Sequence, residues 1–293
     1  TARIMEKFEG VCFSEEPDMV LVVGDVNSTA ACSLVASKLQ IKICHYEAGL
    51  RSRDRNMPEE INRLVTDAIT DLFITTSADA SENLISEGIL PKNIHMLGNL
   101  MIDSLVSHLE LASTQKLNLH NITGTSIDLS WRTKNTPYAM MTFHRPSNVD
   151  EEDTLSILVE EWLKTAELMP IIFPIHPRTL DKLNQFKLFS RLTSSSNIFL
   201  TGPLGYLDFL KLVSESALVI TDSGGIQEET TYLKIPCLTV RPSTERPITI
   251  WVGSNQLVLP EDIFNKSKQI TQIPNTGYNI PKFWDGKAAT RIV

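Results

Sequence analysis

Residues 217–229 read ALVITDSGGIQEE. The apolar run 217–221 predicts a buried strand, and the segment after the glycines predicts a helix. At this junction Ser223, Gly224 and Gly225 let backbone N–H groups approach a ligand closely, and a helix N-terminus favours negative charge. Ser223 is also a candidate N-cap whose hydroxyl can donate to phosphate. The stretch therefore predicts a phosphate site, with an ordinary glycine-rich turn as the alternative.

Short apolar runs alternate with longer amphipathic segments on both sides of this junction. Strands are expected in two series, at 19–24, 42–48, 71–77 and 93–98, and then at 138–143, 170–175, 197–201, 217–221, 236–240 and 256–259. Apolar strands that alternate with helices predict parallel sheets covered on both faces. We therefore expect an α/β fold with two doubly wound, Rossmann-like domains. The first is expected to be incomplete, because four strands are few for such a domain.

The polar, aperiodic stretch 114–135 is the best candidate for a linker between these domains. We accordingly predict a first domain over 1–113 and a second domain over 136–284. Two successive domains of this kind place a ligand in the cleft between them, at the carboxyl ends of the strands.

Composition narrows the classes of partner. A net charge of −8 over 293 residues argues against nucleic acid. The four cysteines are scattered without metal-site spacing, so we expect reduced thiols, no metal and a cytoplasmic protein. No apolar run is long enough for a membrane span.

Polar residues gather where the predicted strands end. In the first series these are Asp25, Glu47, Arg51 and Asn99, with Glu59 in the first turn of a predicted helix. Each has a simpler explanation: Asp25 can cap a turn, and Glu59 can serve the helix dipole. His45, inside a strand, is expected to be a core histidine.

The second series carries residues of the opposite chemistry. His144 and Arg145 follow one strand, and Arg246 follows another. Glu229 lies about two turns into the helix after Gly225, where its carboxylate can accept hydrogen bonds from a ribose diol. Carboxylates in one domain, with cations and an anion loop in the other, suit a sugar and a pyrophosphate.

Together these motifs resemble the non-hydrolysing UDP-N-acetylglucosamine 2-epimerase family. The resemblance spans nearly the whole chain in matching order, and its segments are Gly24-Asp25, HYEAGLRS at 45–52, MPEEINR at 57–63, Gly98-Asn99, His144-Arg145, GPLGY at 202–206, DSGGIQEE at 222–229 and TERP at 244–247. It implies two Rossmann-like domains facing a cleft, as in GT-B glycosyltransferases, with a last helix, 285–293, packing back on the first domain. The family opens with a strand and loop that this chain does not show, so we expect sequence to be missing before Thr1.

The resemblance also implies an activity and roles for the candidates. The activity is interconversion of UDP-GlcNAc and UDP-ManNAc by elimination of UDP and its re-addition to 2-acetamidoglucal, with no cofactor. Asp25, Glu47, Glu59 and His144 are the implied catalytic residues. The implied substrate contacts are Arg51, Asn99, Arg145, Tyr206, Ser223, Gly224, Gly225, Glu229 and Arg246. We expect a homodimer that binds a UDP-sugar, and the alternatives are a GT-B glycosyltransferase and a non-catalytic fragment that binds UDP-sugars.

Overall fold

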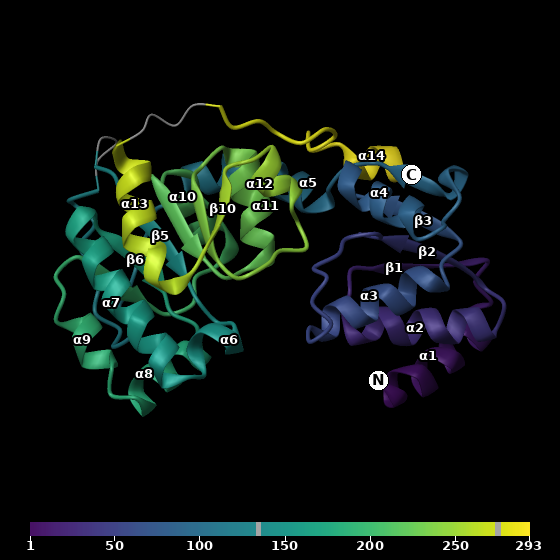
Figure 1. The fold of residues 1–293 in the computed structure, drawn as a ribbon, viewed down its shortest axis with the longest axis horizontal. Helices are drawn as coiled ribbons and strands as arrows, with labels where there is room; N and C mark the ends of the chain where they lie inside the picture. The colour runs from purple at the N-terminus through teal and green to yellow at the C-terminus, as the bar shows by residue number, and fades with distance from the viewer. Residues whose placement is uncertain (133–135, 273–276) are drawn as a thin grey trace. The chain divides into compact units, whose positions relative to one another are not determined.

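The computed structural model describes residues 1–132, 136–272 and 277–293. These residues form two compact units (Figure 1). Unit 1 comprises Thr1–Leu100, Ser243–Ile248 and Lys282–Val293, and unit 2 comprises the described parts of Met101–Pro242 and Thr249–Pro281. The end of the predicted linker, 133–135, and residues 273–276 of the predicted second domain lie outside the described residues.

Unit 1 is built on a parallel sheet with the strand order β1-β2-β3-β4. Its strands are β1 (Met19–Val23), β2 (Lys42–Tyr46), β3 (Leu72–Thr75) and β4 (Ile94–Met96). Its helices are α1 (Ala2–Glu15), α2 (Asn27–Lys38), α3 (Pro58–Ala68), α4 (Ala78–Ser86) and α14 (Ala288–Ile292), with a short 3₁₀ turn η1 (Pro91–Asn93). All four strands lie inside their predicted ranges. Helix α1 was not predicted, and its apolar side chains are mostly not buried: only Cys12 is buried, whereas Val11 and Phe13 are exposed.

Unit 2 is built on a six-stranded parallel sheet with the order β10-β9-β8-β5-β6-β7. Its strands are β5 (Ala139–Thr142), β6 (Ile171–Pro174), β7 (Ile198–Thr201), β8 (Leu218–Thr221), β9 (Cys237–Val240) and β10 (Asn255–Val258). The helices are α5 (Leu100–Thr114), α6 (Pro146–Val149), α7 (Glu152–Leu168), α8 (Pro177–Gln185), α9 (Phe189–Thr193), α10 (Tyr206–Ser214), α11 (Gly224–Leu233), α12 (Ile248–Trp251) and α13 (Ile263–Gln272), with η2 (Pro260–Asp262) before α13. The first residue of α5 and of α12 belongs to unit 1. The predicted α/β fold with two parallel sheets is confirmed.

Alternate residues of β5 enter different cores, which explains why this strand is apolar throughout. Ala139 and Met141 pack in one cluster with Trp162 of α7, whereas Met140 packs in a second cluster with Leu212 of α10. A parallel sheet covered by helices on both faces needs such continuous apolar strands.

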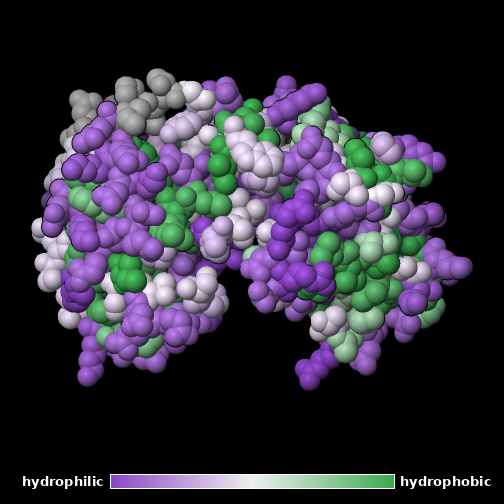
Figure 2. All heavy atoms as spheres, viewed as in Figure 1, coloured by the Kyte–Doolittle hydropathy of each residue, from purple (hydrophilic) through white to green (hydrophobic). Residues whose placement is uncertain are grey.

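The edge strand β1 departs from that pattern. Val20 and Val22 are buried, but Met19, Leu21 and Val23 are each about half exposed. Together with exposed Val26 they form an apolar patch over β1 and α2 of unit 1 (Figure 2). The expectation of a sheet covered on both faces therefore fails at β1, where only one face packs against the helices of unit 1.

The predicted linker also differs from the structure. Leu119 is buried in unit 2, and Trp131 stacks on Phe199 with ring centroids 5.0 Å apart. An isolated bridge joins Asn121 to Thr201 at the end of β7. Spaced apolar side chains thus anchor the described part of this polar stretch on unit 2, and the boundary between the units follows Leu100 and not residue 113.

The C-terminal segment belongs to unit 1. The Trp284 indole donates to the Thr76 carbonyl at 2.8 Å, and Arg291 donates to the Leu97 carbonyl at 2.9 Å. Ile292 of α14 packs against the cluster that contains Tyr46. None of the helices in the described part of the chain is both long enough and apolar enough to cross a bilayer.

Candidate functional site

The strand order of unit 2 reverses at β5. The chain runs from β5 to β6 and β7 on one side, and then returns to β8 on the other side of β5. Loops that follow two strands at such a switch point diverge and leave a crevice outside the carboxyl ends. His144 and Arg145 follow β5, and Ser223 follows β8, so the topology brings these three predicted residues to the same place.

Asp222, directly after β8, connects the loops at this switch point and is fully buried. Its carboxylate accepts hydrogen bonds from the backbone N–H of His144 at 3.0 Å and of Arg145 at 2.8 Å, and from Asn148 Nδ2 at 3.2 Å. Arg145 Nε donates in return to the Asp222 carbonyl at 2.9 Å. Asp222 thereby fixes the loop after β5 against the end of β8. Its position at the start of the DSGGIQEE motif does not by itself predict this role.

The imidazole of His144 is oriented by the same carboxylate. Its Nδ1 lies 3.1 Å from Asp222 Oδ1, and its ring centroid is 5.5 Å from that of His176. Burial acts to raise the pKa of Asp222, but hydrogen bonding and charge from His144, with the backbone N–H groups of Arg145 and His144, lower that pKa below 3.8. An ionised Asp222 that holds Nδ1 leaves Nε2 as the His144 nitrogen that can serve a ligand.

The N-terminus of α11 lies at the same switch point. The helix begins at Gly224 with Ser223 as its N-cap, two residues earlier than the sequence predicted. The Ser223 side chain makes no capping hydrogen bond, so the helix does not use its hydroxyl. A Cβ atom at Gly225 would lie 2.9 Å from the end of the Met101 side chain. The first N–H groups of a helix have no intrahelical acceptors, and this end of α11 therefore suits an anion.

Glu229 is buried on α11, where it accepts a hydrogen bond from the Tyr206 hydroxyl at 3.2 Å. Burial raises the pKa of Glu229, and the bond from Tyr206 offsets this only in part. A buried carboxylate with one hydroxyl donor is stabilised by further hydrogen-bond donors, such as the two hydroxyls of a ribose.

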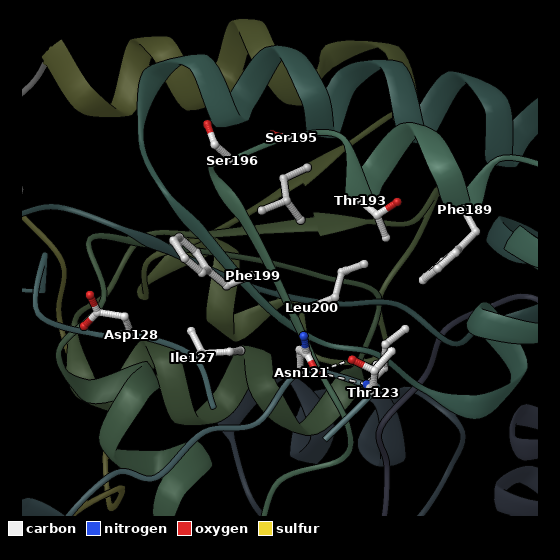
Figure 3. Close-up of a pocket in the computed structure, with 12 residues that line it drawn as sticks. Asn121, Thr123, Ile127, Asp128, Phe189, Thr193, Ser195, Ser196, Phe199 and Leu200 are labelled. Atoms are coloured by element: carbon white, nitrogen blue, oxygen red, sulfur yellow. Dashed lines mark hydrogen bonds between the residues drawn. The ribbon is translucent and has the colours of Figure 1, made fainter. Parts of the chain in front are cut away.

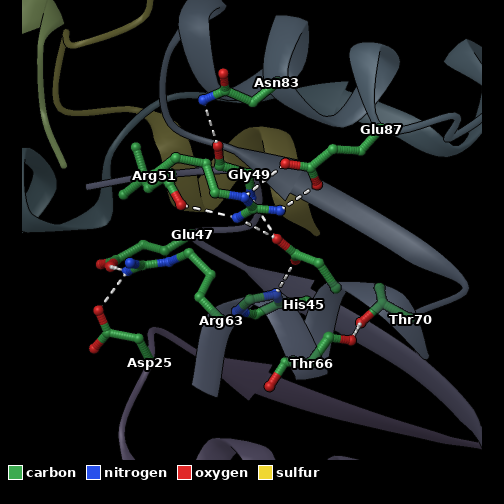
Figure 4. Close-up of polar contacts among 12 residues, drawn as sticks. Asp25, His45, Glu47, Gly49, Arg51, Arg63, Thr66, Thr70, Asn83 and Glu87 are labelled. Atoms are coloured by element: carbon green, nitrogen blue, oxygen red, sulfur yellow. Dashed lines mark hydrogen bonds and ion pairs between the residues drawn. The ribbon is translucent and has the colours of Figure 1, made fainter. Parts of the chain in front are cut away.

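Unit 1 gathers a cluster of opposite charges at the ends of β1 and β2 (Figure 4). Arg63 of α3 is buried, and its Nη2 lies 2.8 Å from Asp25 Oδ2 and 3.8 Å from Glu47 Oε2. Arg246 approaches Glu47 Oε2 to 3.9 Å and also pairs with Glu245. The structure therefore joins Asp25 and Glu47 through Arg63, and Arg246 meets this cluster at Glu47. Sequence reasoning missed Arg63, because its helical position does not distinguish a buried arginine from a surface one.

The other predicted residues of unit 1 lie elsewhere. Glu59 is exposed in the first turn of α3, whereas the neighbouring Glu60 is buried and accepts hydrogen bonds from Ser52 N and Oγ at 2.7 and 2.8 Å. Asn99 is buried where β4 leads into α5. Arg51 is buried and pairs with acidic side chains within unit 1, which favours a supporting role over contact with a substrate.

A cavity of about 410 Å³ opens in unit 2 beside the edge strand β7 (Figure 3). Apolar side chains such as Ile127, Phe189 and Phe199 form much of its wall, and Asp128 is the one ionisable residue among the twelve that line it. Its wall includes no cation to hold a phosphate and none of the predicted site residues. The residues predicted for the site in unit 2 therefore lie at the switch point and not around this cavity.

No cluster of three or more His, Cys, Asp or Glu side chains suited to a metal ion occurs within 1–132, 136–272 and 277–293.

Comparison with known proteins gives consistent matches over the full chain. The family model described as UDP-N-acetylglucosamine 2-epimerase matches residues 1–293. The chain is 42% identical over 297 residues to a UDP-N-acetylglucosamine 2-epimerase of Methanococcus maripaludis, covering 100% of this chain and 79% of that protein. A UDP-2,3-diacetamido-2,3-dideoxy-D-glucuronate 2-epimerase of Pseudomonas aeruginosa is 36% identical over 261 residues, covering 88% of this chain and 68% of the relative.

Solved structures agree with these matches. The UDP-GlcNAc 2-epimerase of Methanocaldococcus jannaschii, in complex with UDP-GlcNAc and UDP, superimposes with a TM-score of 0.84 at 38% identity, covering 99% of this chain and 79% of that one. The enzyme from Neisseria meningitidis, bound to UDP-GlcNAc, gives a TM-score of 0.85 at 28% identity, with coverage of 99% and 79%.

Proposed function

The chain belongs to the UDP-N-acetylglucosamine 2-epimerase family, and on that premise we propose that it interconverts UDP-GlcNAc and UDP-ManNAc without hydrolysis. One observation carries the proposal beyond the family match. Two carboxylates from neighbouring strand ends, Asp25 and Glu47, share the buried cation Arg63 in unit 1. Paired acid–base carboxylates are what epimerisation at an unactivated carbon requires.

In this proposal unit 2 holds the UDP part of the substrate. His144 Nε2, the Arg145 guanidinium and the N-terminus of α11 supply donors to the diphosphate, and Ser223 adds its hydroxyl. Glu229 accepts hydrogen bonds from the ribose. These groups also stabilise the charge that develops when UDP leaves, because donors placed before the reaction need no reorganisation.

In this proposal the carboxylates of Asp25 and Glu47 carry out the chemistry on the sugar. The C2 proton is a poor acid, since no carbonyl group lies next to it. As the C1–O bond breaks, its electron pair passes to the diphosphate oxygen and the ring becomes oxocarbenium-like, which acidifies C2. A carboxylate then removes the proton, and the C2–H electron pair forms the C1=C2 bond of 2-acetamidoglucal. Delivery of a proton to the other face of C2 and return of UDP to C1 give the epimer.

The distances around Arg63 suit two carboxylates with different roles. Asp25 is within hydrogen-bond distance of the guanidinium, whereas Glu47 lies at 3.8 and 3.9 Å from Arg63 and Arg246. Both guanidinium groups therefore attract Glu47, but neither is close enough to hydrogen-bond to its Oε2. That oxygen can exchange a proton with a substrate.

The test is product analysis with UDP-GlcNAc as the sole substrate, in D₂O. We expect UDP-ManNAc with deuterium at C2, because the proton returned to C2 comes from a group that exchanges with solvent. Asp25→Asn and Glu47→Gln should each cut the rate about 10²-fold, the scale of losing a positioned acid or base. Glu82→Gln, at an exposed carboxylate of α4, is the matched control and should leave the rate unchanged.

Other outcomes would contradict the proposal. A glycosyltransferase would give no reaction without an acceptor, and a binding fragment would bind UDP without turnover. Turnover of a UDP-2,3-diacetamido sugar in preference to UDP-GlcNAc would point to the activity in the name of the Pseudomonas aeruginosa relative. Glu59→Gln belongs in the same series, since its exposed position makes it the weakest of the implied catalytic residues.

We also propose that the protein is a homodimer in the cytoplasm. The dimer rests on the family resemblance, and the compartment rests on four cysteines that are all free, as a reducing environment favours. Light scattering at micromolar concentration tests the dimer, and a monomeric mass would refute it.

A further inference from the structure

The two turns that carry Asp25 and Glu47 have unusual backbone conformations. Gly24 has φ = 67°, and Glu47 has the same value although it is not a glycine. A non-glycine residue in this left-handed region is strained and persists only when its surroundings enforce it. Gly49, two residues further on, has φ = 78°, and a Cβ atom there would lie 2.2 Å from the Ala80 carbonyl oxygen. The turn after β2 is therefore pressed against α4 and must be held in one shape.

His45 links the two turns. Its ring is fully buried, with Nε2 2.8 Å from the carbonyl oxygen of Gly24 and Nδ1 2.7 Å from Asp67 Oδ1. Gly24 is the residue directly before Asp25, and His45 lies two residues before Glu47. One imidazole thus contacts the end of β1 from within β2.

Asp67 of α3 anchors this imidazole and the turn after it. Besides His45 Nδ1, its carboxylate meets the Gly49 backbone N–H at 3.1 Å and Arg51 Nη1 at 2.7 Å. Arg51 in turn binds Glu87 through Nε at 2.9 Å and Nη2 at 2.6 Å. The carboxylate is almost completely buried, so all three donors are bound away from water.

Charges alternate along this chain of contacts. Burial acts to raise the pKa of Asp67, but hydrogen bonding and charge from His45 and then from Arg51 lower it, so the carboxylate is ionised. A carbonyl and a carboxylate are both acceptors, and His45 faces one with each nitrogen. Each ring nitrogen therefore has an acceptor within hydrogen-bond distance. Glu87, Arg51, Asp67 and His45 form a row in which acidic and basic side chains alternate.

We propose that Asp67 is a positioning residue for epimerisation: through His45 it sets Asp25 and Glu47 in register, without touching the substrate. The inference rests on the proposed function and assigns the row Glu87–Arg51–Asp67–His45 a part in it. His45 Nδ1 and the Gly49 N–H bind different oxygens of Asp67. Asparagine keeps only one acceptor oxygen, so one of the two contacts is lost and the turns on both sides of the ring then relax.

The first test compares Asp67→Asn with the unaltered chain in the UDP-GlcNAc assay. We expect kcat to fall about 10–100-fold, the lower part of the range for losing correct geometry, with KM and the calorimetric affinity for UDP changed less than about twofold. The matched control is Asp71→Asn, which also removes a carboxylate that accepts a backbone N–H, at Ile43 and 3.0 Å, and pairs with exposed Lys42. It should leave kcat unchanged.

A double-mutant cycle separates positioning from general destabilisation. If Asp67 acts through His45, the double variant with His45→Gln should lose about as much kcat as the more damaged single variant. Losses that multiply, or an Asp67→Asn enzyme with unchanged kcat, would overturn the inference while leaving the epimerase activity in place.

The protonation of the His45 ring can be measured without turnover. Nitrogen-15 spectra of histidine-labelled protein, assigned with His45→Gln, should show both ring nitrogens of His45 protonated, and one of them deprotonated in Asp67→Asn. A singly protonated ring in the unaltered chain would refute the charged row directly. A chain that has the charged row but produces no epimer would instead refute the proposed function and the role drawn from it.

Discussion

Replacement of Asp222 is the sharpest test of the site in unit 2. The fully buried carboxylate accepts hydrogen bonds from His144 N, Arg145 N and Asn148 Nδ2, and it lies beside His144 Nδ1. Alanine at this position leaves the three N–H donors without their acceptor. Asparagine can keep its oxygen toward the two backbone N–H groups and turn its amide toward the imidazole, but it loses the charge.

These contacts set the expected magnitudes. Hydrogen bonds to a charged acceptor are roughly twice as strong as neutral ones, so Asp222→Asn should lower the free energy of unfolding by about 2 kcal/mol through its two shortest bonds. Asp222→Ala should cost about 3–5 kcal/mol, the scale for breaking a buried charged pair. The surface control Asp150→Asn loses the pairing with exposed Arg178 and should cost less than about 1 kcal/mol.

Urea unfolding measures these changes, followed by tryptophan fluorescence, and calorimetry with UDP measures the functional one. UDP affinity should fall at least about tenfold in Asp222→Asn, equivalent to about 1.4 kcal/mol, because His144 and Arg145 lose their common anchor. Equal stability of Asp222→Asn and the unaltered chain, or an equal cost in Asp150→Asn, would refute the reasoning.

The pH dependence has a definite sign. The folded-state pKa of Asp222 lies below its ordinary value of 3.8, since His144 and two backbone N–H groups outweigh the effect of burial. A carboxyl with a lowered folded-state pKa stabilises the fold above its unfolded pKa, and that contribution is lost as the pH falls through the folded value. The stability gap between the unaltered chain and Asp222→Asn should therefore be full at pH 7 and shrink below about pH 4.

Two further predictions concern single positions. Glu229→Gln should weaken UDP binding by roughly 1–3 kcal/mol, the scale of unmade charge-assisted bonds. The same change should raise the stability of the fold at pH 7, because burial raises the pKa of Glu229 and its ionised form opposes folding. This gain should vanish below the ordinary pKa of the group, 4.5, and thermal unfolding at several pH values would measure it. Gly49→Ala should cost about 3 kcal/mol or more and abolish turnover, because its Cβ meets the backbone of Ala80. Gly88→Ala, also at positive φ but with open space around it, should cost only about 1 kcal/mol, and similar losses at both glycines would contradict the packing argument.

The fold was predictable because its strands are buried. A parallel strand between two helical layers is apolar along its whole length, and nine of the ten predicted ranges contain the observed strand. The tenth, β10, begins one residue before its predicted range. The described part of 114–135 was misjudged for the converse reason. Its apolar residues are widely spaced, and only the tertiary structure brings Leu119 and Trp131 onto the core of unit 2.

The candidate site was predictable in position but not in pairing. The rule that ligands lie at the carboxyl ends of strands selected Asp25, Glu47 and His144 from the sequence. Their buried partners come from distant parts of the chain: Arg63 is 38 positions from Asp25, and Asp222 is 78 positions from His144. Such pairings depend on strand order, and for unit 2 that order cannot be derived from local periodicity.

Both clusters follow one physical arrangement, which explains why the partners escaped sequence reasoning. In unit 2 a fully buried anion, Asp222, holds a half-exposed imidazole, and in unit 1 a buried cation, Arg63, holds Asp25 and Glu47, which remain partly exposed. A buried charge is costly unless it is paired, so each buried ion constrains the geometry of its partner strongly. A group that must meet a substrate has to stay accessible, and a buried opposite charge can fix its direction without blocking it. The residue that sets the geometry is therefore the hardest to recognise from the sequence. Variants of Asp222, Arg63 and Asp67 should be as informative as variants of the groups they hold.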